Sequence, residues 1–344
     1  MHRHRPSYVR AFAPLLLASI VWVRPAAAQE AQYLPQADGP LVAEEVQYYE
    51  LPQGDRPHDV APAPDGSVWY TGQGAGVLGR LDPKTGAIKR VPLGVGSKPH
   101  GVIVGPDGAA WVTDGGQNAI VRVDPQTLAV HTWPLPQGRS DANLNTAAFD
   151  RKGRIWFTGQ AGIYGRLDPA TGDMQVWDAP RGRGPYGIAA TPSGDVWFVS
   201  LAGSYLARPD LETGAVEPID PPGKGSGTRR VWSDSAGRLW VSQWNAGTVS
   251  VYNPQKKVWQ TWPLPGETPR AYAVFVDEKD KVWVSDFTGN AIVRFDPETA
   301  DFVSYVSDRE HADVRQMLGR PGELWGAESG TDRLVVVRYG ETVE

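Results

Sequence analysis

The chain has 344 residues, a formal net charge of −5 at pH 7 and no cysteine. The missing cysteines exclude disulfides and thiolate metal sites. The acidic balance argues against a nucleic-acid partner, so we expect none.

The first 28 residues have the pattern of a secretory signal. Arg3, Arg5 and Arg10 form a basic start, residues 11–23 are an apolar run, and residues 26–28 are three alanines at a cleavage-type position. The run is shorter than the roughly 20 residues that span a bilayer. We therefore expect a signal peptide at 1–28, a secreted or periplasmic protein without a membrane span, and a flexible leader at 29–45.

Seven tryptophans recur every 41 to 45 residues, each after a short turn. They are Trp69, Trp111, Trp156, Trp197, Trp240, Trp283 and Trp325. A period of roughly 40–50 residues with four short strands in each repeat is typical of a β-propeller blade. Their regularity indicates packing between neighbouring blades, not a ligand cage.

One repeat shows how the strands are predicted. Residues 101–104 and 110–113 flank the turn residues Asp107-Gly108, a strong hairpin signal because glycine accepts the positive φ of such turns. Two further strands are expected at 119–123 and 130–134.

The last repeat lacks a fourth strand, while residues 46–52 look like the fourth strand of other repeats. We therefore predict an all-β fold in which residues 46–344 form one seven-bladed propeller. The N-terminal strand completes the last blade, closes the ring and hides two sheet edges.

The hairpin geometry predicts which residues meet at one mouth of the central channel. Residues equally distant from a turn centre should lie opposite each other across the first two strands of a blade. The expected pairs are His58/Gly72, His100/Asp114, Asn145/Gly159, Tyr186/Ser200, Arg229/Gln243, Arg270/Asp286 and Arg315/Glu328. They differ in every blade although the scaffold is nearly constant, which indicates a ligand site.

Several of these residues have chemistry that a site could use. His100 beside Asp114 suits a general base oriented by a carboxylate, or a structural pair. Arg229 faces a neutral partner and could bind an anionic group. The pairs of Arg270 with Asp286 and of Arg315 with Glu328 could instead be structural ion pairs.

The motifs resemble those of the virginiamycin B lyase family over about residues 46–339. They include Pro99-His100-Gly101-Val102, the Asp-Gly-x-x-Trp turn at 107–111, and the Trp-x-Leu-Pro ending at 133–136. The resemblance implies a seven-bladed, Mg²⁺-dependent enzyme that opens a cyclic depsipeptide antibiotic by elimination at an ester linkage.

The resemblance also implies site residues. Two histidines one blade apart, followed 14 residues later by an acid, match His58, His100 and Asp114. The resemblance implies that His100 is the base, His58 the second catalytic histidine and Asp114 a metal ligand. Lys98 stands where the family has its other metal carboxylate and is expected to contact the substrate. Glu328 is the candidate replacement ligand for Mg²⁺.

Two alternatives remain open. The first is a non-catalytic exported propeller that binds an anionic ligand or a protein through an arginine-lined mouth, with Tyr186, Arg229, Arg230, Arg270 and Arg315 as candidates. The second is a metal-dependent lactone or ester hydrolase, although such propellers usually have six blades. In each case we expect a monomer, and for the enzyme a small-molecule or cyclic peptide ligand.

Overall fold

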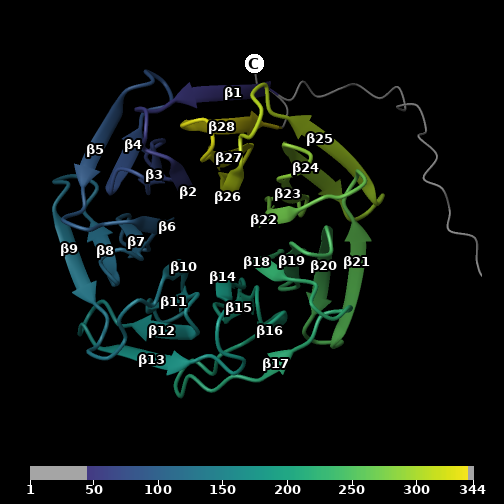
Figure 1. The fold of residues 1–344 in the computed structure, drawn as a ribbon, viewed down its shortest axis with the longest axis horizontal. Helices are drawn as coiled ribbons and strands as arrows, with labels where there is room; N and C mark the ends of the chain where they lie inside the picture. The colour runs from purple at the N-terminus through teal and green to yellow at the C-terminus, as the bar shows by residue number, and fades with distance from the viewer. Residues whose placement is uncertain (1–44, 340–344) are drawn as a thin grey trace, which may run out of the picture. The chain divides into compact units, whose positions relative to one another are not determined.

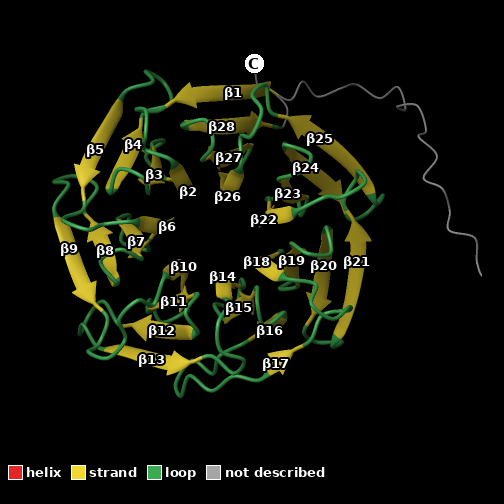
Figure 2. Cartoon of the chain, in the orientation of Figure 1, coloured by secondary structure: helices red, strands yellow, loops and turns green. Residues whose placement is uncertain are grey.

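The computed structural model describes residues 45–339, and these form seven four-stranded antiparallel sheets arranged in a ring (Figures 1 and 2). The predicted seven-bladed all-β propeller is confirmed. The predicted signal peptide and all of the predicted leader except Glu45 lie outside the described residues. Within 45–339, no helix has the length and hydropathy needed to cross a bilayer.

Blade one is the blade that contains β2. In blades one to six the four strands follow each other from the channel outward in chain order, and in blade seven β1 takes the outermost place. The innermost strands are β2 (Pro57–Pro62), β6 (Pro99–Val104), β10 (Leu144–Phe149), β14 (Pro185–Ala190), β18 (Thr228–Ser233), β22 (Ala271–Val276) and β26 (Val314–Arg320). The second strands are β3 (Val68–Gly72), β7 (Ala110–Asp114), β11 (Ile155–Gly159), β15 (Val196–Ser200), β19 (Leu239–Gln243), β23 (Val282–Asp286) and β27 (Glu323–Glu328).

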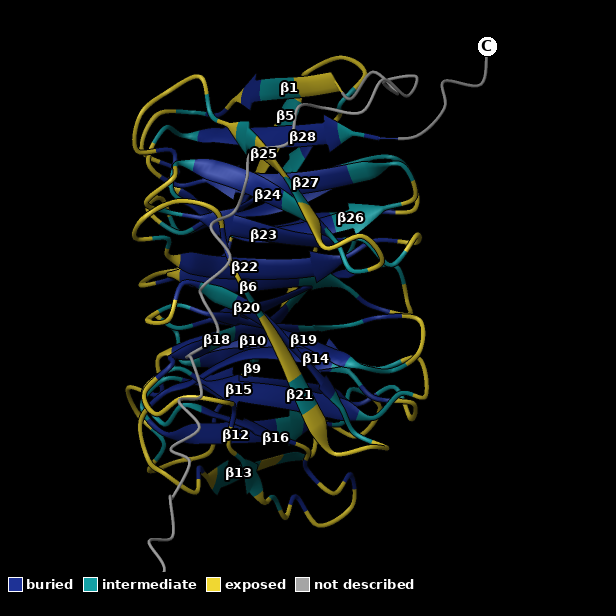
Figure 3. Ribbon diagram, turned by 90° about the vertical axis from the view of Figure 1, so that its right-hand side faces the viewer, coloured by how far each residue is buried: buried dark blue, intermediate teal, exposed yellow. Residues whose placement is uncertain are grey.

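The two outer positions of each blade are filled in the same way. The third strands are β4 (Val77–Leu81), β8 (Ala119–Val123), β12 (Ile163–Leu167), β16 (Tyr205–Ala207), β20 (Thr248–Asn253), β24 (Ala291–Asp296) and β28 (Arg333–Arg338). The outermost strands are β5 (Ile88–Pro92), β9 (Val130–Pro134), β13 (Met174–Asp178), β17 (Pro218–Ile219), β21 (Val258–Pro263), β25 (Asp301–Val306) and β1 (Glu45–Glu50). Figure 3 shows exposed residues on β21 and β25 and buried residues on the inner strands.

The N-terminal strand closes the ring. β1 pairs with β28 over six residues, from Glu45 opposite Arg338 to Glu50 opposite Arg333. Tyr49 of β1 stacks on Trp325 of the same blade, with ring centroids 5.5 Å apart. The sheet that ends the chain is therefore completed by the strand that begins the propeller.

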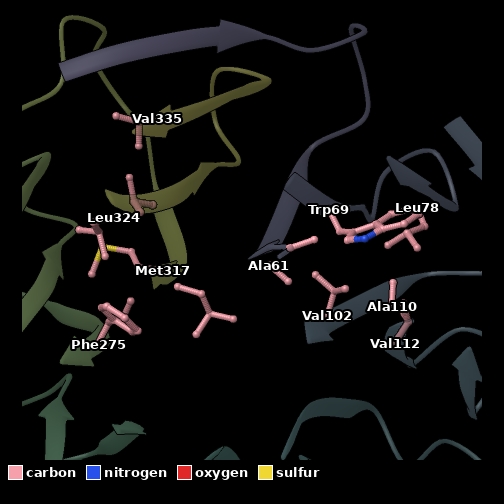
Figure 4. Packing of buried hydrophobic residues seen from close by; sticks show 14 of the residues in the cluster. Ala61, Trp69, Leu78, Val102, Ala110, Val112, Phe275, Met317, Leu324 and Val335 are labelled. Carbon is pink, nitrogen blue, oxygen red and sulfur yellow. The ribbon is translucent and has the colours of Figure 1, made fainter. Parts of the chain in front are cut away.

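The repeating tryptophans pack between blades. Trp69 of blade one belongs to a buried cluster with Val102, Ala110 and Val112 of blade two (Figure 4). The indole N–H groups are satisfied where a hairpin carboxylate accepts from them, as in Trp156 to Asp150 at 2.9 Å. The donor of Trp156 is thus paired within its own hairpin, whereas Nε1 of Trp69 is buried without a partner.

A β-bulge follows the first residue of every innermost strand. In blade two, Pro99 lies opposite Asp114 and Gly101 opposite Thr113, so His100 is the extra residue. The same register shift occurs between the first two strands of all seven blades. A bulge leaves its extra residue unpaired and re-aims the side chain, and here it frees one residue per blade at the channel mouth.

Candidate functional site

The second residues of the seven innermost strands form a polar ring at one end of the channel. They are His58, His100, Asn145, Tyr186, Arg229, Tyr272 and Arg315. Side chains from non-neighbouring blades meet there: the hydroxyls of Tyr186 and Tyr272, in blades four and six, are 2.6 Å apart. The ring is thus a three-dimensional cluster that crosses the channel.

The two histidines lie against each other. The ring centroids of His58 and His100 are 3.7 Å apart, and the side chains belong to residues that are only 4% and 5% exposed. His58 Nδ1 is 2.7 Å from Asp59 Oδ1. Because the carboxylate accepts from Nδ1–H, the lone pair of His58 is on Nε2, which has no hydrogen-bond partner among residues 45–339.

His100 is held differently. Its Nε2 is 3.2 Å from Asn145 Nδ2, and its Nδ1 is buried without a partner. Burial lowers the pKa of both histidines well below the usual value, and for His58 the nearby Arg230, Arg315 and Arg229 lower it further. Both rings are therefore neutral at neutral pH.

Arg230 joins the histidine pair to the opposite side of the ring. Its Nη2 is 3.2 Å from Asp59 Oδ1, and its Nη1 donates to Thr146 Oγ1 at 3.2 Å. Burial raises the pKa of Asp59, although the adjacent Arg230 acts in the opposite direction. One Asp59 oxygen thus binds both His58 and Arg230, while the other, Oδ2, has no partner.

Arg229 lies among aromatic rings. Its Nη2 donates to Tyr186 Oη at 3.0 Å, and its Cζ is 3.5 Å from the Tyr272 ring centroid and 4.5 Å from that of Trp244. Burial alone would raise the pKa of Tyr272, but Arg229, Arg230 and Arg315 outweigh it, so the pKa of this phenol is lowered.

The predicted cross-strand pairs are wrong in all seven blades, because another residue of the innermost strand takes the place opposite the second-strand partner. In blade two the bulge puts Pro99, and not His100, opposite Asp114. Asp114 Oδ1 accepts backbone N–H groups from Lys98, Gly116 and Gln117, each at 2.9 Å. Its Oδ2 accepts from Ser97. Asp114 therefore holds the loops on either side of β6 and β7.

Two predicted ion pairs are also wrong. Glu328 is 2.7 Å from Arg333 and also accepts from Ser307 and Thr331, whereas the Arg315 Nε donates to Ser329 Oγ at 2.6 Å. The exposed Arg270 meets Asp286 through its backbone N–H, at 2.7 Å.

The structure brings together six of the sequence-predicted residues, five in the ring and Arg230 beside them, and leaves others outside the cluster. His58, His100, Tyr186, Arg229 and Arg315 belong to the ring. Lys98 is exposed, and Arg270 has its Cζ 5.6 Å from the Trp244 ring. Tyr272 takes the blade-six position expected for Arg270. The blade-six hairpin has the same length as that of blade two, but Asp280, at φ 57°, replaces the turn glycine, so the sequence lacks the residue that marks the turn centre elsewhere.

The sequence reasoning missed Asp59 and Tyr272. Asp59 follows His58 directly in the sequence, and this adjacency of a carboxylate and a histidine on a predicted innermost strand could have indicated their contact. Tyr272 would have been found by aligning the buried hairpin acid Asp277, which accepts from Trp283 as Asp150 does from Trp156.

Residues 39–294 match the model of the virginiamycin B lyase family. The chain belongs to this family. The fold is also similar to solved structures described as a streptogramin B lyase (22% identity, TM-score 0.79, covering 86% of this chain and 98% of that one) and a catalytically inactive virginiamycin B lyase from Staphylococcus aureus with quinupristin (19%, 0.80, 87% and 100%).

A third solved structure with a similar fold is YCF48 bound to D1 peptide, at 14% identity and TM-score 0.68, covering 86% of this chain and 97% of that one. At such identities these likenesses establish the propeller fold. No curated protein matches the chain in sequence.

The Mg²⁺ expected from the virginiamycin B lyase family does not fit the carboxylates proposed for it. Asp114 and Glu328 are saturated by protein donors, as described above. Among residues 45–339, one group of three possible ligands lies within 4.8 Å: His58, Asp59 and His100. This group has one carboxylate, already paired with Arg230, whereas Mg²⁺ prefers several oxygens.

Proposed function

We propose that this protein is a carbon–oxygen lyase that opens a cyclic depsipeptide ester by elimination. His58 serves as the general base in this reaction, and Asp59 orients it. Family membership supports the reaction class. The observation that carries the assignment is the His58–Asp59 contact, which leaves a neutral Nε2 with a free lone pair in the channel cluster.

The elimination requires one proton transfer and one bond cleavage. His58 Nε2 removes the proton α to a carbonyl, the C–O bond at the neighbouring β carbon breaks, and the ester oxygen leaves as a carboxylate. Asp59 accepts from Nδ1–H and stabilises the imidazolium that forms. The buried ring has a lowered pKa, so it is unprotonated and ready to accept a proton at neutral pH.

The role of base passes from His100 to His58 in this proposal. His100 has its Nε2 beside the Asn145 amide, so the nitrogen that would take a proton already accepts a hydrogen bond. Its ring packs on His58 and fixes the orientation of that ring. His100 therefore positions the base.

The test is an assay of quinupristin opening by mass spectrometry with purified protein. Elimination leaves the mass of the opened product unchanged, whereas hydrolysis adds one water. Replacing His58 with Ala should lower kcat by about 10²–10⁴-fold, the usual contribution of a general base. Asp59→Asn should also lower kcat, because it removes the charge that orients the base and stabilises the imidazolium.

A matched control is His131→Ala, since His131 is an exposed histidine on the outermost strand β9. It should keep full activity. Full activity in the His58→Ala protein would contradict the assignment of the base. A product one water heavier would contradict elimination.

A further inference from the structure

The polar ring at the channel mouth, together with Asp59 and Arg230, is called the channel cluster. It holds more positive than negative charge. The Cζ atoms of Arg229 and Arg230 are 3.5 and 5.9 Å from the Tyr272 ring centroid. Arg315 has its Cζ 5.8 Å from the ring of Phe287, which stacks on Tyr272, so the three guanidinium groups lie around the same pair of rings. The only ion pair that these three arginines make with residues 45–339 is the contact of Arg230 with Asp59. Since both histidines are neutral, two guanidinium charges have no counter-charge.

Hydrogen-bonding capacity is also left over at the same place. Nε of Arg229 and Nε of Arg230 are buried without a partner, and the Arg230 residue is only 4% exposed. Burying an unpaired charged donor is costly, so such groups normally find an acceptor. An anion bound between these arginines would supply it.

Aromatic rings surround the unpaired charge. Tyr272 stacks on Phe287, with centroids 4.6 Å apart and planes 17° apart, and Trp244 packs edge-on against both. Arg315 approaches Phe287 from another side, with its Cζ 5.8 Å from the ring centroid. Trp244 and Phe287 are half-buried, so they present apolar surface beside the charged groups.

We propose that Arg229, Arg230 and Arg315 form a binding site for a carboxylate carried on an aromatic or apolar group. Guanidinium groups pair with carboxylates through charge-assisted hydrogen bonds, and the rings of Trp244 and Phe287 pack against the rest of the ligand. The role of this site in catalysis rests on the proposed function, in which it receives the carboxylate that leaves. The binding itself does not depend on turnover.

The experiment is isothermal titration of the full-length protein with benzoate, with benzamide as the neutral isostere and inorganic phosphate as the competing anion. Benzoate should bind at one site per chain and at least about tenfold more tightly than benzamide, because a charged hydrogen bond is lost in the amide. Tighter binding of phosphate than of benzoate would overturn the carboxylate assignment.

Two variants test the residues. Arg229→Gln and Arg315→Gln should each weaken benzoate binding by about 10- to 100-fold. Arg315 is half-buried and its guanidinium bonds only to Ser329, so its replacement keeps the fold even if that of Arg229 does not. The matched control is Arg183→Gln, an exposed arginine just before β14, which should bind benzoate as the parent does.

The outcomes separate this proposal from the lyase proposal. Equal affinity for benzoate and benzamide, or an equal loss of affinity in the Arg183→Gln control, would overturn the carboxylate site. A protein that binds benzoate as expected but does not open quinupristin would refute the lyase and leave the site standing. A protein that opens quinupristin but binds no benzoate would overturn the carboxylate site and support the lyase.

Discussion

Acidification should destabilise this protein through its two buried histidines. In the unfolded chain each histidine has a pKa of about 6.5, whereas in the folded protein burial lowers the pKa of His58 and His100 well below that value. Below the unfolded pKa, the unfolded chain binds protons that the folded protein does not. The free energy of unfolding therefore falls as the pH falls from 7.5 toward the folded pKa values.

The size of the effect follows from the pKa of about 6.5 in the unfolded chain and from the change in pH. Between pH 7.5 and 5.5, one histidine that stays neutral in the folded state removes about 1.4 kcal/mol of stability, and two remove about 2.8 kcal/mol. The raised pKa of Asp59 acts in the opposite direction, so a difference between variants is the sharper measurement.

The assay is urea unfolding followed by tryptophan fluorescence at a series of pH values. His58→Gln keeps a hydrogen-bond donor for Asp59 but cannot titrate, so its loss of stability between pH 7.5 and 5.5 should be smaller by about 1.4 kcal/mol. His131→Gln, at the exposed histidine of β9, should follow the parent. Identical pH dependence in the parent and in His58→Gln would refute the reasoning.

Three further predictions concern the scaffold and the metal. Gly187→Ala would place a Cβ 2.6 Å from Arg230 Cα and should destabilise the protein by about 1–3 kcal/mol, while Gly115→Ala, with its nearest neighbour at 3.5 Å, should cost less in the same urea assay. Deleting β1 should expose β28 as an edge and cause aggregation visible by light scattering; a monomeric, cooperatively unfolding product would contradict the closure argument. Chelation with EDTA should leave quinupristin opening unchanged, because Asp114 and Glu328 are saturated by protein donors; loss of turnover that Mg²⁺ restores would contradict this.

The architecture could be predicted from the sequence because it depends on a repeated local signal. A tryptophan after an Asp-Gly turn, as at Trp111, fixes the position of a hairpin without knowledge of distant residues. The match of residues 46–52 to fourth strands elsewhere also predicted ring closure. The last repeat lacked a fourth strand, and pairing it with residues 46–52 removes two exposed sheet edges.

The site was harder to predict because a bulge shifts the register between the first two strands of each blade by one residue. The mirror rule assumes a regular ladder, and the bulge at His100 breaks it in a way that the glycine and proline pattern does not reveal. Some partners also lie across the channel: Asp59 meets Arg230, 171 positions later in the chain. No pairing within one hairpin could have found that contact.

The pairing of β1 with β28 sets the order in which the protein can be completed. Blades one to six are each built from one contiguous segment of the chain. Blade seven joins the first described strand to the last, so the pairing of β1 must wait until β28 has been synthesised. His58 and Arg315 come from the two blades at this junction, and the channel cluster is therefore assembled only after both blades have been synthesised.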